Sequence, residues 1–121
     1  METLTPQEER AMQYIWKTGM CCVKDILLCY PDPKPRYTSL ASIMNSLKQK
    51  GYLDARRFGS TYIYTPLVKE EEYAGKSVSR LVEDYFADSY KNMVSFCARE
   101  QKISKKDLDD IIRCIEEQKG E

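Results

Sequence analysis

The sequence predicts a mainly α-helical chain with one small β-hairpin, and three observations support this fold class. Apolar residues recur at helical spacing in three short segments before residue 51. The spacing changes to two between residues 52 and 65, and helical spacing then returns from residue 70 onward. We therefore expect a part with helices and a hairpin, followed by a part made of helices.

The composition is that of a folded, soluble protein that lacks a common catalytic residue. The 121 residues include 19 basic and 19 acidic side chains, 42% apolar residues and no histidine. This length allows one compact domain, or a small domain with an appendage. Without histidine, Ser-His and Cys-His nucleophile pairs, His-ligated zinc and Cys2His2 fingers are excluded. We therefore expect a protein that is not an enzyme and that holds no cofactor or metal.

The cysteines and the lack of long apolar stretches indicate the cytoplasm. No apolar signal segment precedes Leu4, and no stretch is long enough to span a membrane, so membrane insertion is not expected. The cysteines are odd in number and lack C-x-x-C spacing, which is typical of a reducing compartment. Their ordinary role is that of small hydrophobic residues, and they are Cys21, Cys22, Cys29, Cys97 and Cys114.

Two short helices are expected before residue 31. Thr5 can cap a helix that begins at Pro6, because Glu8 stands where a capping box needs a carboxylate. A second, shorter apolar pattern covers residues 23–30. Three prolines within residues 31–35 then forbid helix, so a stiff exposed loop should follow.

A third helix is expected from Thr38, a good N-cap, to Lys50, just before Gly51. Its apolar stripe consists of Leu40, Ile43, Met44 and Leu47. Its other face carries small or polar residues and no acidic one, namely Ser39, Ala41, Ser42, Asn45, Ser46 and Lys48. Such a face suits close approach to a polyanion, because a carboxylate beside phosphate would raise the Coulomb energy.

A β-hairpin follows directly after the third helix. Residues 52–56 alternate between apolar and polar side chains, residues 58–60 supply a turn, and residues 61–65 form the second strand. Arg56 and Arg57 lie near the tip. Three helices followed by such a hairpin are typical of the winged variant of the helix-turn-helix.

The neutral total charge hides two halves of opposite sign. Residues 1–68 carry nine basic and six acidic side chains, whereas residues 69–121 carry ten basic and thirteen acidic ones. Within residues 34–57, six basic side chains stand against Asp54 alone. A local excess of this kind is what phosphate binding requires.

Three segments, residues 37–53, 58–67 and 71–73, give the chain a specific resemblance. Their most distinctive pieces are Lys50-Gly51-Tyr52-Leu53 and Tyr62-Ile63-Tyr64-Thr65-Pro66. Together with the opening residues they resemble the penicillinase repressor family, the BlaI/MecI type of bacterial transcriptional regulator. The resemblance implies a winged-helix DNA-binding domain in residues 1–68, a helical dimerisation domain in residues 69–121, and repression at palindromic operators.

Eight residues are assigned to double-stranded operator DNA. The candidates for base edges in the major groove are Thr38, Ser39, Ser42 and Asn45. The residues placed on phosphates are Tyr37, Lys48, Arg56 and Arg57. The family often has Gly-Arg at the wing turn, where this chain has Gly59-Ser60, so the basic wing contact is expected from the two arginines. The copper-responsive branch has clustered C-terminal cysteines, and the isolated Cys114 argues against copper sensing.

Residues 69–121 are predicted to build a homodimer. Apolar residues keep a helical stripe for about five turns from Val78 to Cys97, which a lone small domain could not cover. A capping box at Ser104 begins a last amphipathic helix. The alternative is that these helices fold back on residues 1–68 of the same chain. The predicted dimerisation residues are Val78, Leu81, Val82, Tyr85, Phe86, Met93, Val94, Leu108, Ile111, Ile112 and Ile115.

The resemblance also implies a mode of induction and a further partner. In antibiotic-responsive members, a membrane-embedded zinc protease sensor leads to cleavage of the repressor at an Asn-Phe bond within the dimerisation helices. The similar position here is Ser95-Phe96. Cleavage at that bond would split the apolar stripe and lower operator affinity.

Two other function classes remain open from the residues alone. The third helix could dock a protein instead of DNA, in which case DNA binding would be absent or insensitive to salt. The chain could also be a thiol-based redox regulator that uses Cys21, Cys22 or Cys29.

Overall fold

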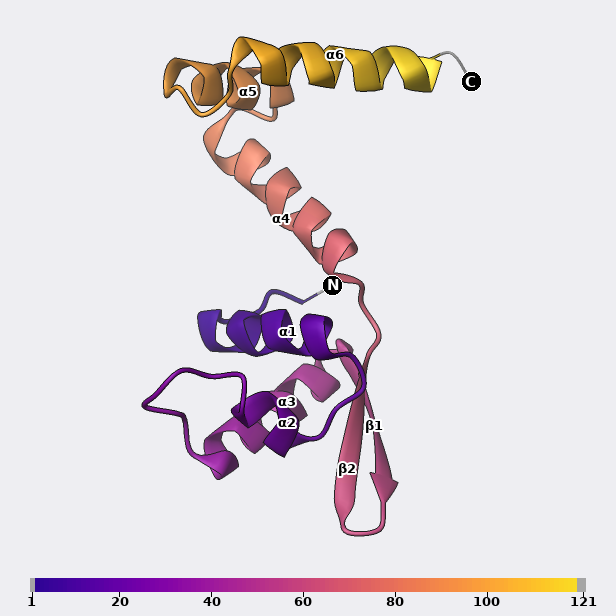
Figure 1. Cartoon of the computed structure of the whole chain (residues 1–121). Helices are drawn as coiled ribbons and strands as arrows, with labels where there is room; N and C mark the ends of the chain where they lie inside the picture. The colour runs from indigo at the N-terminus through magenta and orange to yellow at the C-terminus, as the bar shows by residue number, and fades with distance from the viewer. Residues whose placement is uncertain (1, 120–121) are drawn as a thin grey trace. The chain divides into compact units, whose positions relative to one another are not determined.

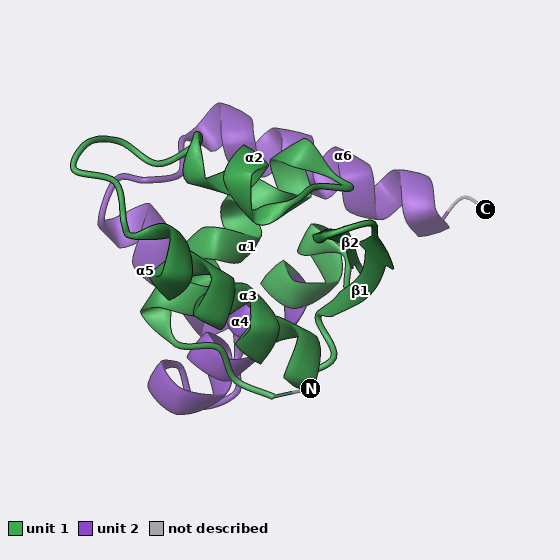
Figure 2. Cartoon of the chain, turned by 90° about the horizontal axis from the view of Figure 1, so that it is seen from below, with its two compact units in different colours: residues 1–74 green, residues 75–121 purple. Residues whose placement is uncertain are grey.

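Figure 1 shows the computed structural model, which describes residues 2–119. The chain forms two compact units, which divide between Ala74 and Gly75 (Figure 2). The first unit contains α1 (Pro6–Thr18), α2 (Val23–Leu27), α3 (Tyr37–Gln49), β1 (Leu53–Phe58) and β2 (Thr61–Pro66). Helix α4 (Glu70–Tyr85) begins in the first unit, and the second unit also contains α5 (Tyr90–Arg99) and α6 (Lys105–Lys119). The mainly helical fold with one antiparallel hairpin confirms the predicted fold class.

Helix α1 begins as the sequence predicts. The Thr5 hydroxyl accepts a hydrogen bond from the Glu8 N–H (3.2 Å), and the Glu8 carboxylate accepts one from the Thr5 N–H (2.8 Å). This reciprocal pair is the expected capping box. Pro6 occupies the first helical position, where no N–H partner is needed.

The N-cap predicted for the third helix is wrong. Helix α3 starts at Tyr37, so Thr38 is its second residue, and Arg36 occupies the N-cap without a side-chain hydrogen bond. The Arg36 carbonyl accepts from the Leu40 N–H (3.0 Å), and Leu40 is fully buried. The first helical hydrogen bond therefore closes onto Arg36, ahead of the position where the capping preference of threonine would start the helix.

The core of the first unit lies between the three helices and the base of the hairpin. Helix α3 packs on α1, α2 and β1, and its Leu40, Met44 and Leu47 are inaccessible to solvent. These apolar positions are the ones that the sequence predicts. The buried cluster consists of Leu4, Ala11, Met12, Ile15, Cys21, Val23, Ile26, Leu40, Met44, Leu47, Tyr52, Leu53 and Tyr64.

The hairpin is a two-stranded wing that projects from one end of the three-helix cluster (Figure 1). Phe58 pairs with Thr61, so Gly59 and the residue after it form a two-residue turn. Gly59 has a φ of +63°, which glycine adopts without steric conflict. The Cys21 and Tyr64 backbones exchange two hydrogen bonds (3.0 and 2.7 Å), which tie the α1–α2 connection to the wing.

The second unit corrects the expectation of one uninterrupted apolar stripe. Helices α4 and α5 are separated by residues 86–89, where Ala87 and Asp88 have φ of +53° and +57°. The Ser89 hydroxyl accepts from the Asn92 N–H (3.1 Å) and caps α5. The apolar spacing is the same on both sides of this break, so periodicity could not locate it.

Helix α6 begins with the predicted capping box. The Ser104 hydroxyl accepts from the Asp107 N–H (3.0 Å), and the Asp107 carboxylate accepts from the Ser104 N–H (2.9 Å). These backbone and side-chain hydrogen bonds to Ser104 lower the pKa of Asp107. Across residues 2–119, none of the helices has both the length and the apolar character that crossing a bilayer requires.

Candidate nucleic-acid interface

All eight residues assigned to DNA by the sequence are exposed on the first unit. Exposure is a condition that any direct contact with a duplex must meet. The eight do not form one uniform surface, because they lie on different faces of α3 and of the wing. They are Tyr37, Thr38, Ser39, Ser42, Asn45, Lys48, Arg56 and Arg57.

The outermost face of α3 carries Thr38, Ser42, Asn45 and Gln49. Their spacing of four, three and four residues places them on one side of a helix, opposite the buried stripe. Gln49 is not among the residues assigned from the sequence, although it lies one turn beyond Asn45. Extending the same helical count by four residues would have found it. We call these four residues the outer face of α3.

Ser39 lies to one side of the outer face, in an open groove of about 990 Å³. The groove runs between α1, the loop before α3 and the first turns of α3 itself. Arg10 and Arg36 line it, and no acidic residue does. Neither arginine was among the assigned contacts. Arg10 lies on α1, far from the third helix in sequence, and Arg36 precedes the first residue of α3. Its residues are Pro6, Gln7, Arg10, Tyr30, Pro33, Pro35, Arg36, Thr38, Ser39, Ser42 and Ile43.

The wing separates Arg56 from Arg57. Arg57 pairs with Tyr62, and alternate residues of a strand point to opposite faces, so Arg57 and Tyr62 share the face that continues into the core. The Arg57 Nε donates to the Gly59 carbonyl (2.9 Å), which orients the guanidinium along the turn. Arg56 lies on the other face and forms an exposed ion pair with Asp54 (3.2 Å). Arg57 is thus the wing arginine on the same side as α3.

A smaller hollow of about 280 Å³ lies between α2, α3 and the wing. Tyr37, Tyr62 and Lys24 line it, together with the hydroxyl groups of Ser60 and Thr61. No acidic side chain is among its lining residues. Hydroxyl groups and an ammonium group are the donors that phosphate oxygens accept from. Lys24 was not assigned by the sequence reasoning, because it precedes the basic segment 34–57.

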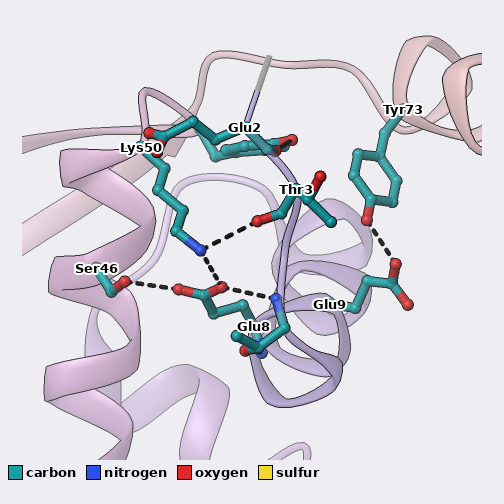
Figure 3. A network of polar contacts seen from close by, with 9 residues as sticks. Glu2, Thr3, Glu8, Glu9, Ser46, Lys50 and Tyr73 are labelled. Carbon is teal, nitrogen blue, oxygen red and sulfur yellow. Dashed lines mark hydrogen bonds and ion pairs between the residues drawn. The ribbon is translucent and has the colours of Figure 1, made fainter.

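A buried polar network joins the C-terminal end of α3 to α1 (Figure 3). The Glu8 carboxylate accepts from the Lys50 Nζ and from the Ser46 Oγ, both at 2.6 Å, and Glu8 is 5% exposed. Burial by itself would raise the pKa of Glu8, but the hydrogen bonds from Lys50, Ser46 and the Thr5 N–H lower it to about 2. Glu8 is therefore charged at neutral pH, and Lys50 is engaged inside the protein.

Cys21 is too well buried to act as a redox sensor in the folded unit. Its side chain is 2% exposed, and burial raises the pKa of its thiol to about 12. Reaction with oxidants proceeds through the thiolate, which is scarcely populated at such a pKa. Of the cysteines named for the redox hypothesis, Cys22 is half-buried and Cys29 is exposed.

The predicted dimerisation residues lie mostly on exposed apolar faces of the second unit. Leu81 is 45% exposed and Ile112 is 51% exposed. The side chains of Val78, Ile111 and Ile115 are exposed to a similar degree, and that of Tyr85 is more exposed. Phe86, Met93, Val94 and Leu108 are half-buried. Val82 is the exception, because it is fully buried within the single chain. Apolar faces of this extent normally lie against another surface.

The first unit combines an outer α3 face of hydroxyl and amide groups with a basic wing and two acid-free hollows. These groups can donate and accept hydrogen bonds along a polyanion, and nothing in their arrangement resembles a nucleophile with its base. Comparison of the chain with curated proteins finds no match. The model of the penicillinase repressor family matches residues 4–117, and the chain therefore belongs to this family of transcriptional repressors.

Proposed function

We propose that this repressor binds palindromic operator DNA as a homodimer and that α3 enters the major groove. The observation that carries the proposal is the outer face of α3, which is exposed, free of acidic residues and flanked by a basic wing. A helix with short polar side chains can approach the base edges closely in a groove about 12 Å wide. The winged-helix order of elements in the first unit supports the same placement.

The side chains divide into two roles. Asn45 and Gln49 each offer an amide that can bind adenine through its N6 and N7 atoms, while Thr38, Ser39 and Ser42 offer hydroxyl groups. Tyr37, Lys48, Arg56 and Arg57 are proposed to contact phosphates, with Arg57 nearest to the side of α3. Phosphate contacts supply affinity and register, and base contacts supply sequence preference.

The homodimer is supported by the apolar faces of the second unit. One recognition helix reads too few base pairs for useful selectivity, whereas two helices related by a twofold axis read both halves of a palindrome. The exposed isoleucines of α6 and the apolar side chains of α4 would be covered by the second copy. Dimerisation through residues 69–121 would then control how fully the operator is occupied.

The test is to footprint the purified protein on the intergenic DNA beside its own gene and to measure affinity across a salt series. We expect two protected half-sites related by symmetry. Affinity should fall by about 0.9 log unit per log unit of salt for each phosphate that is neutralised. Absent or salt-insensitive binding would contradict the proposal and favour a winged-helix module that docks a protein.

We also propose that cleavage between Ser95 and Phe96 ends repression, as in the antibiotic-responsive type of the family. Both residues lie inside α5, and the Phe96 ring packs against Phe86 at a centroid distance of 5.5 Å. Cleavage would remove α6 and its apolar face from the rest of the dimerisation region. Incubation with a cognate membrane-bound sensor protease should give fragments ending at Ser95 by mass spectrometry, and an intact chain would disprove this step.

A further inference from the structure

The segment between β2 and α4, which leads to the second unit, is hydrogen-bonded to the core of the first unit. The Leu67 N–H donates to the Tyr52 carbonyl (2.9 Å), and the Trp16 indole N–H donates to the Val68 carbonyl (2.8 Å). These hydrogen bonds attach Leu67 and Val68, which lie between β2 and α4, to the core of the first unit. This short segment is therefore fixed to the core of the first unit.

Tyr73 extends this attachment into the first turn of α4. Its hydroxyl donates to the Glu9 carboxylate on α1 (Figure 3). Its ring packs against Trp16 at 5.6 Å and against Tyr52 at 5.9 Å between ring centroids. Tyr52 is 1% exposed, so this contact joins the first turn of α4 directly to the core. We call Trp16, Glu9, Tyr52 and Tyr73 the α4 clamp.

Gly75 follows the clamp two residues later and lies inside α4, at the division between the two units. Its φ is that of an ordinary helical residue, and a Cβ added to it would meet no atom within 4 Å. Neither backbone conformation nor packing therefore requires glycine at this position. Glycine inside a helix nevertheless weakens it, because it loses more conformational freedom than alanine when the helix forms.

We infer that Gly75 is a pivot in α4 and that the α4 clamp is the positioning device that confines bending to this point. The inference rests on the proposed dimeric DNA binding and concerns how the two winged units reach both half-sites. A helix attached at its first turn and weakened just beyond it will bend at the weak point. The spacing between half-sites that the dimer tolerates is then set by residues 73–75, far from the bases.

Loss of the clamp and replacement of Gly75 should have opposite effects on the range of half-site spacings that the dimer tolerates. Loss of the clamp makes the connection flexible over several more residues, which lowers the effective concentration of the second winged unit at its half-site. Replacing the pivot by alanine stiffens α4 and narrows the range of distances that the pair can reach. Neither change touches the outer face of α3 or the exposed apolar residues of α6.

The experiment measures affinity for a series of operators in which the footprinted half-sites are moved apart or together by one to four base pairs. For Tyr73→Ala we expect about a tenfold loss at the best spacing and a flatter dependence on spacing. Tyr73→Phe keeps the rings, loses the hydrogen bond to Glu9, and should show a smaller change in the same direction. For Gly75→Ala we expect the best spacing to keep its affinity, while the other spacings lose about three- to tenfold more than in the wild type.

The controls separate positioning from folding and dimerisation. Affinity for DNA with a single half-site and the dimer dissociation constant should stay within about twofold of the wild type in each variant. Ala74→Gly should widen the tolerated spacings, as the reciprocal of Gly75→Ala. Tyr14→Phe removes a tyrosine hydroxyl elsewhere on α1 and should leave the spacing profile unchanged.

A spacing profile identical to the wild type in either Tyr73→Ala or Gly75→Ala would overturn the inference. If Tyr73→Ala also loses half-site binding, the winged unit has been damaged, and the Tyr73→Phe profile decides in its place. The wild-type measurements test the proposed function separately. A wild-type protein that is monomeric, or that does not bind the operator, would contradict the proposed function before any variant is compared.

Discussion

Glu8 is the charged side chain that α1 buries against α3, and its interactions make a specific contribution to stability. Its carboxylate is bound by the Lys50 ammonium, the Ser46 hydroxyl and the Thr5 N–H, all within 2.8 Å. A buried carboxylate keeps its charge only when such partners replace water. The network therefore fixes the C-terminal half of α3 while removing one lysine from the basic surface.

The pKa of Glu8 predicts how the first unit responds to acid. Because the pKa in the folded chain is about 2, below the ordinary 4.5, the contribution is fully present above pH 4.5. It is lost as the pH falls toward 2, and it amounts to about 3 kcal/mol of unfolding free energy. Urea unfolding followed by the fluorescence of Trp16, the single tryptophan, should show this loss in the wild type.

In Glu8→Gln, the free energy of unfolding at pH 7 should fall by about 2–3 kcal/mol, because Lys50 loses its charged partner. The difference from the wild type should shrink as the pH approaches 2. Asp54→Asn breaks an exposed ion pair and should change stability by less than about 0.5 kcal/mol. Equal stability of Glu8→Gln and the wild type at pH 7 would show that the network does not stabilise the fold.

The two proposed kinds of DNA contact predict different responses to mutation. Asn45→Ala and Gln49→Ala should each relax sequence preference at one base position per half-site, at a cost of about 1–3 kcal/mol on the preferred base. Lys48→Ala and Arg57→Ala should weaken binding to all sequences alike and reduce the salt slope by about 1 for each residue. Affinity measured on operator and random DNA over a salt series distinguishes them. Equal losses on both DNAs for Asn45→Ala would refute its assigned role.

At the scale of the elements, α4 carries the clearest departure from helical preference. Gly75 lies within a helix of 16 residues and has open space where a Cβ would stand. Gly75→Ala should therefore stabilise α4 by about 0.5–1 kcal/mol, because alanine loses less conformational freedom on forming a helix. Circular dichroism at 222 nm during thermal unfolding should show a raised midpoint, and a lowered one would mean that α4 does not tolerate a Cβ at this position.

The break between α4 and α5 shows what a helix pattern alone cannot locate. Val78, Val82 and Met93 follow helical spacing as if the chain ran straight, yet Ala87 and Asp88 take left-handed backbone conformations between them. The Asp88 N–H donates to the Val82 carbonyl (3.0 Å), which satisfies the end of α4. Such a turn depends on local hydrogen bonds and on the Ser89 cap, which apolar periodicity does not record.

At the scale of the whole molecule, the exposed apolar face of α6 predicts that association controls DNA binding. Ile115→Asp places a carboxylate on a face that is 48% exposed at this residue in the single chain. We expect the dimer to dissociate in sedimentation experiments at micromolar concentration, while the winged unit keeps its fold. Operator affinity should fall about 100-fold, since the two half-sites would be bound independently. Glu116→Gln on the same helix is the control, and a monomeric wild type would contradict the dimer.

Local patterns along the chain predict the order of the elements, the cap of α1, the acid-free face of α3 and the family. These depend on spacing and on neighbours within four residues, such as Thr5 with Glu8 or Ser104 with Asp107. Such neighbours do not show that α3 starts at Tyr37 or that Gln49 belongs to its outer face.

Contacts between side chains from distant segments are visible in the folded chain alone. Folding joins Lys50 to Glu8, attaches Tyr73 to α1 and forms the groove beside Arg10. The physical reason is that local preferences act over one or two turns of chain, whereas burial and hydrogen bonding bring together residues tens of positions apart, and no spacing pattern records that encounter.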